Sequence, residues 1–341
     1  MRVLITGGAG YIGTHTLLEV LAADHEVCVI DNFSNSAPEA LERVKALSNR
    51  RFTFQKCDMR DREALIGHLT NFKPEAIIHF AGLKAVGESV EMPLEYYENN
   101  VQGAINLLHA MKVSGCNNIV FSSSATVYGD PDFLPITEDH PLRSTNPYGR
   151  SKLHIEDMLR DVASSNPDFT AAILRYFNPV GAHESGRIGE DPNGIPNNLM
   201  PMIAQVAVGR RAQVKVFGND YDTPDGTGVR DYIHVVDLAK AHIAALDWTK
   251  THREARAFNL GVGKGVSVME MIEAFAKASG QEIPFQNDPR RESDIATCYA
   301  DPSRAEAELG WKAKIGLAEM CETCWHWQET NPLGYAIKTR R

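Results

Sequence analysis

The stretch Thr6-Gly7-Gly8-Ala9-Gly10-Tyr11-Ile12-Gly13 decides the fold of this chain. An apolar, β-branched run at residues 2–6 precedes it and favours a strand, and residues 16–21 after it have helical spacing. Three of its glycines recur at every third residue. Glycines permit a tight turn, and they leave the backbone amides at the start of the helix free to meet a pyrophosphate. The stretch therefore predicts a strand-turn-helix unit that can bind a dinucleotide.

A second strand is predicted at residues 27–30, and it ends in Asp31. This aspartate follows the glycines by about twenty residues, the spacing at which a carboxylate meets the adenosine ribose of a dinucleotide. A carboxylate there accepts hydrogen bonds from the ribose hydroxyls and repels a 2′-phosphate. The two features together predict NAD rather than NADP as the cofactor.

The alternation of strands and helices continues through the first half of the chain. Further strands are predicted at residues 52–57, 76–80, 118–121 and 172–174, with helices notably around 99–114 and 148–165. This order predicts an α/β fold with a Rossmann-like, doubly wound parallel sheet. Ligands bind beyond the carboxyl ends of the strands in such a sheet. We expect Ser122-Ser123-Ser124, just past the fifth strand, on that ligand side.

After about residue 176 the chain becomes irregular and rich in proline. Short elements are predicted at residues 214–217, 235–246 and 257–260, without a flexible linker or an internal repeat. We therefore expect an NAD-binding domain at residues 1–176. A smaller mixed α/β lobe should occupy residues 177–341, and some of its segments can pack back on the first domain.

Tyr148 and Lys152 form an i,i+4 pair if residues 148–165 are helical. A cation beside a phenol favours the phenolate and lowers the tyrosine pKa, so that the side chain can take up and return a proton. By themselves the two residues could equally belong to a surface helix that begins with a tyrosine. The predicted dinucleotide site nearby favours the catalytic interpretation.

The composition is that of an ordinary globular protein. The 341 residues are 43% hydrophobic and 23% charged, with a net charge of −9 that disfavours nucleic-acid or membrane-surface binding.

No apolar run approaches the ~20 residues of a membrane span, and a strand at residues 2–5 leaves no room for a signal peptide. Six dispersed cysteines then suggest the reducing cytoplasm. Cys321 and Cys324 lack a second pair and the histidines lack metal-ligand spacing, so we expect structural roles and no metal.

Several longer motifs resemble the UDP-glucose 4-epimerase family of extended short-chain dehydrogenases/reductases. They lie at residues 6–13, 79–89, 122–129, 175–182, 194–201 and 225–232, together with Tyr148-x-x-x-Lys152, and the resemblance covers essentially the whole chain. It implies oxidation of the sugar at C4, turnover of the 4-keto sugar within the pocket, and return of the hydride to the opposite face. NAD would stay tightly bound and be restored in each cycle.

The resemblance also implies residue roles. Tyr148 would be the base, Lys152 would lower the tyrosine pKa and bind the nicotinamide ribose, and Ser124 would hydrogen-bond the 4-oxygen. The NAD contacts carried over are Gly7, Gly10, Tyr11, Ile12, Asp31, Asn32, Asn35, Ser36, Asp58, Met59, Phe80, Ala81, Gly82, Lys84, Asn99, Tyr148, Lys152 and Phe177. The substrate contacts are Ser124, Asn178, Asn198, Leu199, Phe217, Arg230, Arg291, Asp294 and Cys298.

Cys298 departs from part of the family, since members restricted to unmodified hexoses carry a tyrosine there. A small residue leaves room for a 2-N-acetyl group, so the resemblance implies UDP-GlcNAc and UDP-GalNAc as further substrates beside UDP-glucose and UDP-galactose. The alternative is that a neighbouring side chain fills the space.

The resemblance further implies a homodimer, formed through the helices at 99–114 and 148–165 as a four-helix bundle. Apolar residues on these helices suit that role but could equally face the sheet; they are Leu107, Leu108, Met111, Met158 and Leu159.

Two rival functions stay open at this point. A 4,6-dehydratase would carry an Asp-Glu pair after the serines, where this chain has Ala125 and Thr126. A non-catalytic NAD-binding regulator could keep the glycines but would not need the Tyr148–Lys152 pair.

Overall fold

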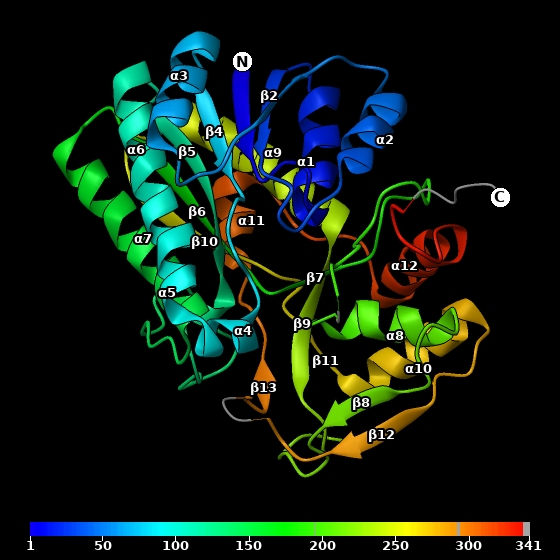
Figure 1. The fold of residues 1–341 in the computed structure, drawn as a ribbon. Helices are drawn as coiled ribbons and strands as arrows, with labels where there is room; N and C mark the ends of the chain where they lie inside the picture. The colour runs from blue at the N-terminus through cyan, green and yellow to red at the C-terminus, as the bar shows by residue number, and fades with distance from the viewer. Residues whose placement is uncertain (195, 292–293, 337–341) are drawn as a thin grey trace.

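The architecture is built around one seven-stranded sheet. The computed structural model describes residues 1–194, 196–291 and 294–336. The strands lie in the order β10 (Ala255–Leu260), β6 (Thr170–Tyr176), β5 (Asn118–Ser124), β4 (Ala76–His79), β1 (Arg2–Thr6), β2 (Glu26–Asp31) and β3 (Thr53–Lys56). Every neighbouring pair is parallel. All the carboxyl ends therefore lie at one edge of the sheet, as Figure 1 shows.

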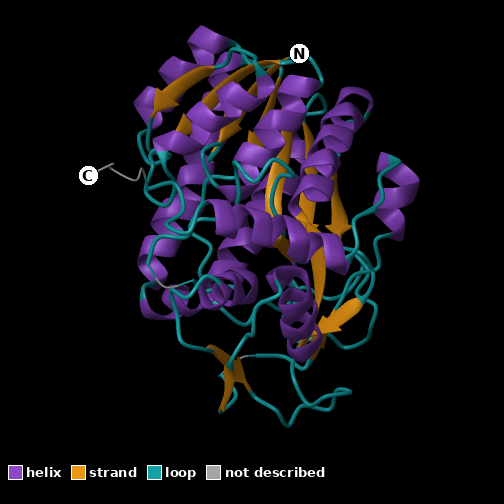
Figure 2. Cartoon of the chain, turned by 90° about the vertical axis from the view of Figure 1, so that its right-hand side faces the viewer, coloured by secondary structure: helices purple, strands orange, loops and turns teal. Residues whose placement is uncertain are grey.

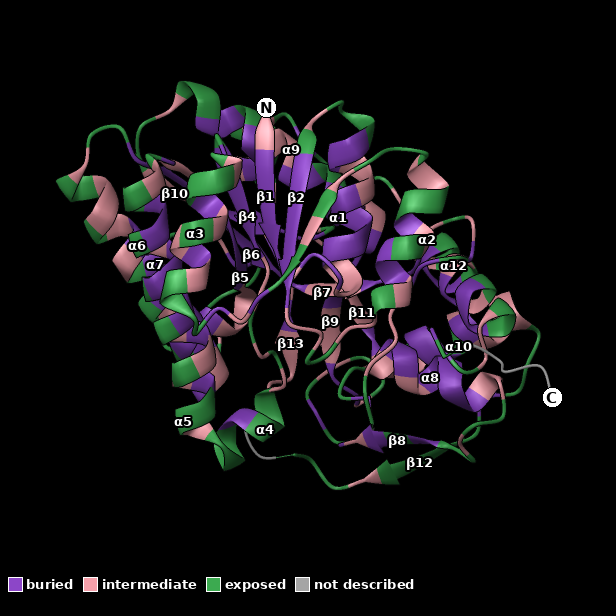
Figure 3. Cartoon of the chain, turned by 45° about the horizontal axis from the view of Figure 1, so that its top comes forward, coloured by how far each residue is buried: buried purple, intermediate pink, exposed green. Residues whose placement is uncertain are grey.

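Helices cover both faces of this sheet (Figure 2). One face packs against α1 (Tyr11–Ala22), α2 (Pro38–Ser48), α9 (Val235–Thr251) and α11 (Ser303–Leu309). The other packs against α3 (Arg62–Phe72), α6 (Gly103–Ser114) and α7 (Pro147–Ser165). The central strands are buried on both faces because helices cover each, as Figure 3 shows for β1, β2 and β4. These findings confirm the predicted Rossmann-like α/β fold.

A smaller group of elements lies beyond the carboxyl edge of the sheet (Figure 1). β9 (Val229–His234) pairs with β7 (Asn178–Val180) and β13 (Thr297–Cys298) in parallel and with β11 (Gly265–Ser267) in antiparallel. β8 (Val214–Phe217) pairs with β12 (Phe285–Asp288). Helices α8 (Leu199–Ala207), α10 (Val268–Ser279) and α12 (Leu317–Thr330) share a separate apolar core with these strands.

The remaining helical pieces lie in the connections of the main sheet. α4 (Val86–Glu91), α5 (Pro93–Tyr96) and the π-helical turn η1 (Tyr97–Gln102) lead into α6, and the 3-10 turn η2 (Ala125–Val127) follows β5. The predicted helix at 99–114 is therefore the end of η1 joined to α6. Among the residues that the structure describes, no helix is both long and apolar enough to cross a membrane.

Two details differ from the sequence prediction. The fifth strand does not stop at residue 121 but runs through Ser124, because β6 supplies hydrogen-bonding partners along its whole length up to Tyr176. The segment at 257–260, expected among the short elements of the second lobe, belongs to β10 and extends the main sheet beside β6. The division at residue 176 stays a prediction, although residues 235–260 pack with the first domain.

Candidate active site

The predicted glycine turn lies between β1 and α1, at the carboxyl edge of the sheet. Gly7 has φ +68°, and a Cβ there would lie 2.6 Å from the Ala81 amide nitrogen. A Cβ on Gly13 would overlap the Gly7 carbonyl oxygen. Both positions therefore require glycine, because the chain segments approach too closely for a side chain.

The N-terminus of α1 suits an anionic group. Its N-cap residue Gly10 supplies no side chain to bond the first-turn amides, and among the described residues no other side chain is recorded as a cap for this helix. Amides of this kind, at the positive end of the helix dipole, bind phosphate. The amides of Tyr11 and Ile12 lie in that turn, and the Tyr11 hydroxyl donates to the Gly181 carbonyl oxygen at 2.6 Å. The turn thus fits a dinucleotide pyrophosphate.

Asp31 closes β2 and organises the neighbouring loops. Its carboxylate accepts hydrogen bonds from the Ala9 amide (3.0 Å), the Phe33 amide (2.8 Å) and the Ser36 hydroxyl (2.9 Å). The glycine turn and the loop after β2 therefore meet at one buried carboxylate. Asn32 in this loop donates to Asp58, which lies just after β3. Asn35 is exposed and accepts weakly from the Asn193 amide.

The other predicted NAD residues follow the ends of further parallel strands. Met59 comes after β3, the run Phe80 to Lys84 after β4, and Phe177 after β6, while Asn99 lies in η1. The structure thus brings the predicted NAD residues to one edge, as expected for ligands of a doubly wound sheet.

Ser124, Tyr148 and Lys152 meet where β5 ends and α7 begins. Asn146 caps α7 by accepting from the Gly149 amide at 2.8 Å, and Pro147 occupies the first turn. Tyr148 and Lys152 are therefore one turn apart on α7. The Lys152 ammonium is buried, donates to the Ser122 carbonyl oxygen at 2.7 Å and lies 5.9 Å from the centre of the Tyr148 ring. The Ser124 hydroxyl accepts from the Thr126 amide and hydroxyl.

The pKa of Tyr148 is shifted in the opposite direction to the one predicted from its neighbour Lys152. Burial raises the pKa of Tyr148, and hydrogen bonding with Ser124 lowers it only in part. Burial also lowers the pKa of Lys152 to about 8, and the Glu156 carboxylate opposes that shift. The predicted lowering of the tyrosine pKa by Lys152 is therefore not seen in the protein alone, because removal from water disfavours the phenolate.

The predicted substrate residues come from the second group of elements. Asn178 begins β7, Asn198 is the N-cap of α8, and Leu199 is its first residue. Phe217 ends β8, and Arg230 lies on β9 with its guanidinium bonded to the Val229 carbonyl oxygen.

Arg291 and Asp294 lie between β12 and β13. Arg291 lies 4.7 Å from the Phe217 ring centre and pairs with Asp294 at 2.8 Å. The structure thus places two predicted phosphate-binding arginines in this group, Arg230 on β9 and Arg291 beside Phe217.

Cys298 lies on β13, directly opposite Arg230 on β9. It is buried in an apolar cluster with Phe177, Val127 and Tyr128, which connects it to the turn after Ser124. Burial raises the pKa of the Cys298 thiol to about 11, so the thiol is neutral near pH 7 and is no nucleophile. The expected structural role of Cys321 and Cys324 agrees with their burial in the core of the second group.

Two residues that support the site escaped the sequence prediction. Asn100 is buried, bonds the Leu83 backbone in both directions and donates to the Ser151 hydroxyl on α7. Glu190 accepts from Lys84 at 3.1 Å and from Asn198 at 3.2 Å, so it connects a predicted cofactor residue with a predicted substrate residue. Asn100 left no distinct signal in the sequence, because it stands among other polar residues, Glu98, Asn99 and Gln102. Glu190 left none, because its partners are distant in the chain.

Comparison with known proteins gives consistent matches over nearly the whole chain. The family model described as GDP-mannose 4,6 dehydratase matches residues 4–324. The UDP-glucose 4-epimerase of Bacillus subtilis (strain 168) is 58% identical, with 98% of this chain and 99% of the relative covered.

Solved structures agree. The UDP-glucose 4-epimerase from Bifidobacterium longum in complex with NAD+ and UDP is 53% identical with a TM-score of 0.95, covering 98% of this chain and 100% of that one. The UDP-Glc/GlcNAc 4-epimerase from Campylobacter jejuni is 41% identical with a TM-score of 0.84, covering 96% of this chain and 99% of that one.

Proposed function

The chain belongs to the UDP-glucose 4-epimerase family of extended short-chain dehydrogenases/reductases, and from that membership we propose how its residues divide the work of the reaction. The enzyme interconverts UDP-galactose and UDP-glucose with NAD as its cofactor. Bound NAD accepts the hydride from C4 of the sugar and returns it to the other face of the 4-keto intermediate. Net turnover is therefore isomerisation, and no cofactor is consumed.

Tyr148 takes the proton from the sugar 4-hydroxyl and gives it back on the return step. The positioned Ser124 hydroxyl hydrogen-bonds the 4-oxygen and the phenol. Because burial alone raises the tyrosine pKa, the base needs the Lys152 ammonium together with the positive charge of oxidised nicotinamide. The observation that carries this assignment is the meeting of Ser124, Tyr148 and Lys152 at the edge that also holds the uncapped N-terminus of α1.

Arg230 and Arg291 neutralise the UDP diphosphate, and the other contacts to the UDP-sugar come from Asn178, Asn198, Leu199, Phe217 and Asp294. The two arginines explain how a chain with a net negative charge binds an anionic substrate, since guanidinium groups pair well with phosphate oxygens. Few polar groups are assigned to the hexose, which must present both faces of C4 to the cofactor in turn.

Purified protein tests this function directly. We expect NAD to be released only on denaturation, and UDP-galactose to be converted to UDP-glucose without added cofactor. Bound NAD without turnover would instead support a non-catalytic regulator. Release of a 4-keto-6-deoxy sugar would support a dehydratase, which Ala125 and Thr126 disfavour because neither is an efficient acid or base.

We further propose that the enzyme interconverts UDP-GlcNAc and UDP-GalNAc. The support is the small Cys298 beside Arg230, and the relative from Campylobacter jejuni is described as acting on both sugar classes. The test compares turnover of both pairs in the wild type and in Cys298→Tyr. The variant should lose the acetylated pair and keep UDP-galactose turnover, whereas a wild type inactive on the acetylated pair would contradict the idea.

A homodimer is proposed from the family resemblance. The apolar residues named above for the four-helix bundle face the sheet instead. Leu107, Met111 and Leu159 belong to the core under the sheet, and the partly buried Leu108 and Met158 pack against that core. The exposed large apolar side chains on these two helices are Ile105 and Val113, both on α6. Ile105→Glu should therefore yield monomers in sedimentation velocity, while Phe285→Glu, at an exposed residue of β12, should leave dimers. Monomeric wild type at micromolar concentration would contradict the proposal.

The six cysteines are free and buried, which supports a reducing compartment, and we propose the cytoplasm.

A further inference from the structure

A buried ion pair joins β6 to α7, one turn along α7 from Lys152. Arg175 on β6 grips Glu156 on α7 with two hydrogen bonds, Nε to Oε1 at 3.0 Å and Nη2 to Oε2 at 2.7 Å. The side chains are 1% and 0% exposed. A forked, fully buried pair of this kind holds its two elements in a fixed relation, because any slip breaks both bonds.

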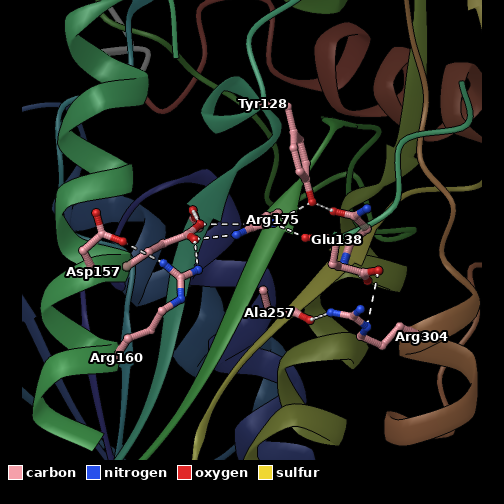
Figure 4. Close-up of polar contacts among 10 residues, drawn as sticks. Tyr128, Glu138, Asp157, Arg160, Arg175, Ala257 and Arg304 are labelled. Carbon is pink, nitrogen blue, oxygen red and sulfur yellow. Dashed lines mark hydrogen bonds and ion pairs between the residues drawn. The ribbon is translucent and has the colours of Figure 1, made fainter. Parts of the chain in front are cut away.

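The pair sits at the centre of a wider network that Figure 4 traces. Arg175 also donates to the Tyr128 hydroxyl at 2.8 Å, and Tyr128 donates to Asn259 on β10 at 2.6 Å. Arg160 reaches Glu156 from the surface at 2.6 Å and pairs with the exposed Asp157 at 2.9 Å. Two strands, the turn after η2 and α7 therefore meet at these side chains.

The network contacts the catalytic residues through their immediate neighbours. Glu156 lies one turn beyond Lys152 on α7, and it accepts from the Ser123 hydroxyl at 2.6 Å, one residue before Ser124. Lys152 in turn donates to the carbonyl oxygen of Ser122. The end of β5 is thus joined to α7 twice, at Ser122 and Ser123, the two residues that precede Ser124.

Glu156 also sets the charge around Lys152. The titratable groups that face this ammonium are Tyr148 and Glu156 on α7 and the buried neutral His79 on β4. Glu156 is the carboxylate that opposes the lowering of the Lys152 pKa by burial. Arg175 and Arg160 face Glu156 and keep it ionised.

We propose that Glu156 and Arg175 are positioning residues of the epimerase reaction, which hold β5 against α7 at the spacing that Ser124, Tyr148 and Lys152 require and keep the Lys152 ammonium charged. The inference rests on the function proposed above. A buried ion pair by itself is weak evidence for stability, since a hydrophobic pair often serves as well. A role in positioning the catalytic residues and in keeping Lys152 charged explains why the chain buries two charged side chains here.

The test is the pH dependence of kcat in Glu156→Gln, which keeps the side-chain shape and removes the charge. We expect kcat to fall by about tenfold or more, which is part of the roughly 10²–10⁴-fold that a well-placed proton-transfer group contributes. The KM for UDP-galactose should change less than about twofold. The alkaline limb should move to lower pH, because Lys152 then loses its proton more readily. If the pH profile of kcat does not shift, or if the fraction of unfolded variant accounts for the whole loss of kcat, the ion pair has only a structural role.

Two further variants make the result decisive. Asp157→Asn removes an exposed carboxylate from the same helix and the same arginine, and should leave rate and profile unchanged. Arg160→Gln removes a competing cation from Glu156, so the alkaline limb should move to higher pH. Arg160→Gln carries the test alone if Glu156→Gln does not fold, and no upward shift would then overturn the proposal. Wild-type turnover in the same assay separates failure of this inference from failure of the proposed function.

Discussion

At the residue scale the site depends on two buried groups whose charged forms burial disfavours. Tyr148 has a raised pKa and Lys152 a pKa lowered to about 8, so charge on neighbouring groups favours the working form of each. Glu156 supplies it to the lysine. The positive nicotinamide can supply it to the tyrosine only while the cofactor is oxidised. The base is therefore strongest when a hydride has yet to leave the sugar.

Replacing Tyr148 by phenylalanine tests this assignment. Turnover should fall by about 10²–10⁴-fold, since the variant lacks the proton-transfer group. UDP affinity, measured by calorimetry on the NAD-loaded protein, should stay within about twofold, because the assigned UDP contacts lie on other elements. A parallel loss of UDP binding would mean that the tyrosine is misplaced.

At the element scale the turn between β1 and α1 tolerates no side chain at Gly13, where a Cβ would overlap the Gly7 carbonyl oxygen and crowd Gly8. Gly67 in α3 is the opposite case, because it is exposed and a Cβ there would meet open space. Substitutions at these two positions therefore distinguish a steric requirement for glycine from the general cost of glycine to helix stability.

Gly13→Ala should therefore lower the free energy of unfolding by about 1–3 kcal/mol, the range for overpacking, and the purified variant should retain less NAD. Gly67→Ala should raise it by about 0.5–1 kcal/mol, because alanine is the better helix former. Urea unfolding and the NAD released on denaturation measure both effects. Full NAD content in Gly13→Ala would contradict the close approach seen at the turn.

At the scale of the whole molecule, four buried histidines link stability to pH. Burial lowers the pKa of His15 and His79 to about 3 and of His234 and His242 to about 4. They stay neutral in the fold but bind protons near pH 6.5 when unfolded. Their contribution to stability is thus complete above pH 6.5 and is lost as pH falls toward 4. Asp231 opposes them, because burial raises its pKa to about 6 and the native state holds its proton longer.

Unfolding at pH 5 should consequently take up protons, and the urea midpoint should fall steadily between pH 6.5 and 4.5. His15→Gln removes one titrating group from this set. The number of protons taken up, from the pH dependence of the unfolding free energy, should then drop by about one. An unchanged number in the variant would show that His15 is already charged in the fold.

The sequence was sufficient where function depends on local order. The glycine turn, Asp31 and the Tyr148–Lys152 pair each lie within one predicted element, so their spacing already indicated an NAD site in a parallel sheet. Glu156, Arg175 and Glu190 could not be found in this way, because each gains its meaning from a partner on another strand or loop. The sign of the tyrosine pKa shift was also out of reach, since burial depends on the complete fold.

The place of β10 in the main sheet has a consequence during synthesis. β6 pairs with β10 along residues 171–176, yet β10 leaves the ribosome about eighty residues later, and synthesis proceeds at typical rates of 5–20 residues per second. For several seconds the nascent chain presents an unpaired strand edge, which invites aggregation or a chaperone. Polypeptides stalled when β6 has left the ribosome and β10 has not should therefore bind chaperones more strongly than those in which both strands have left it.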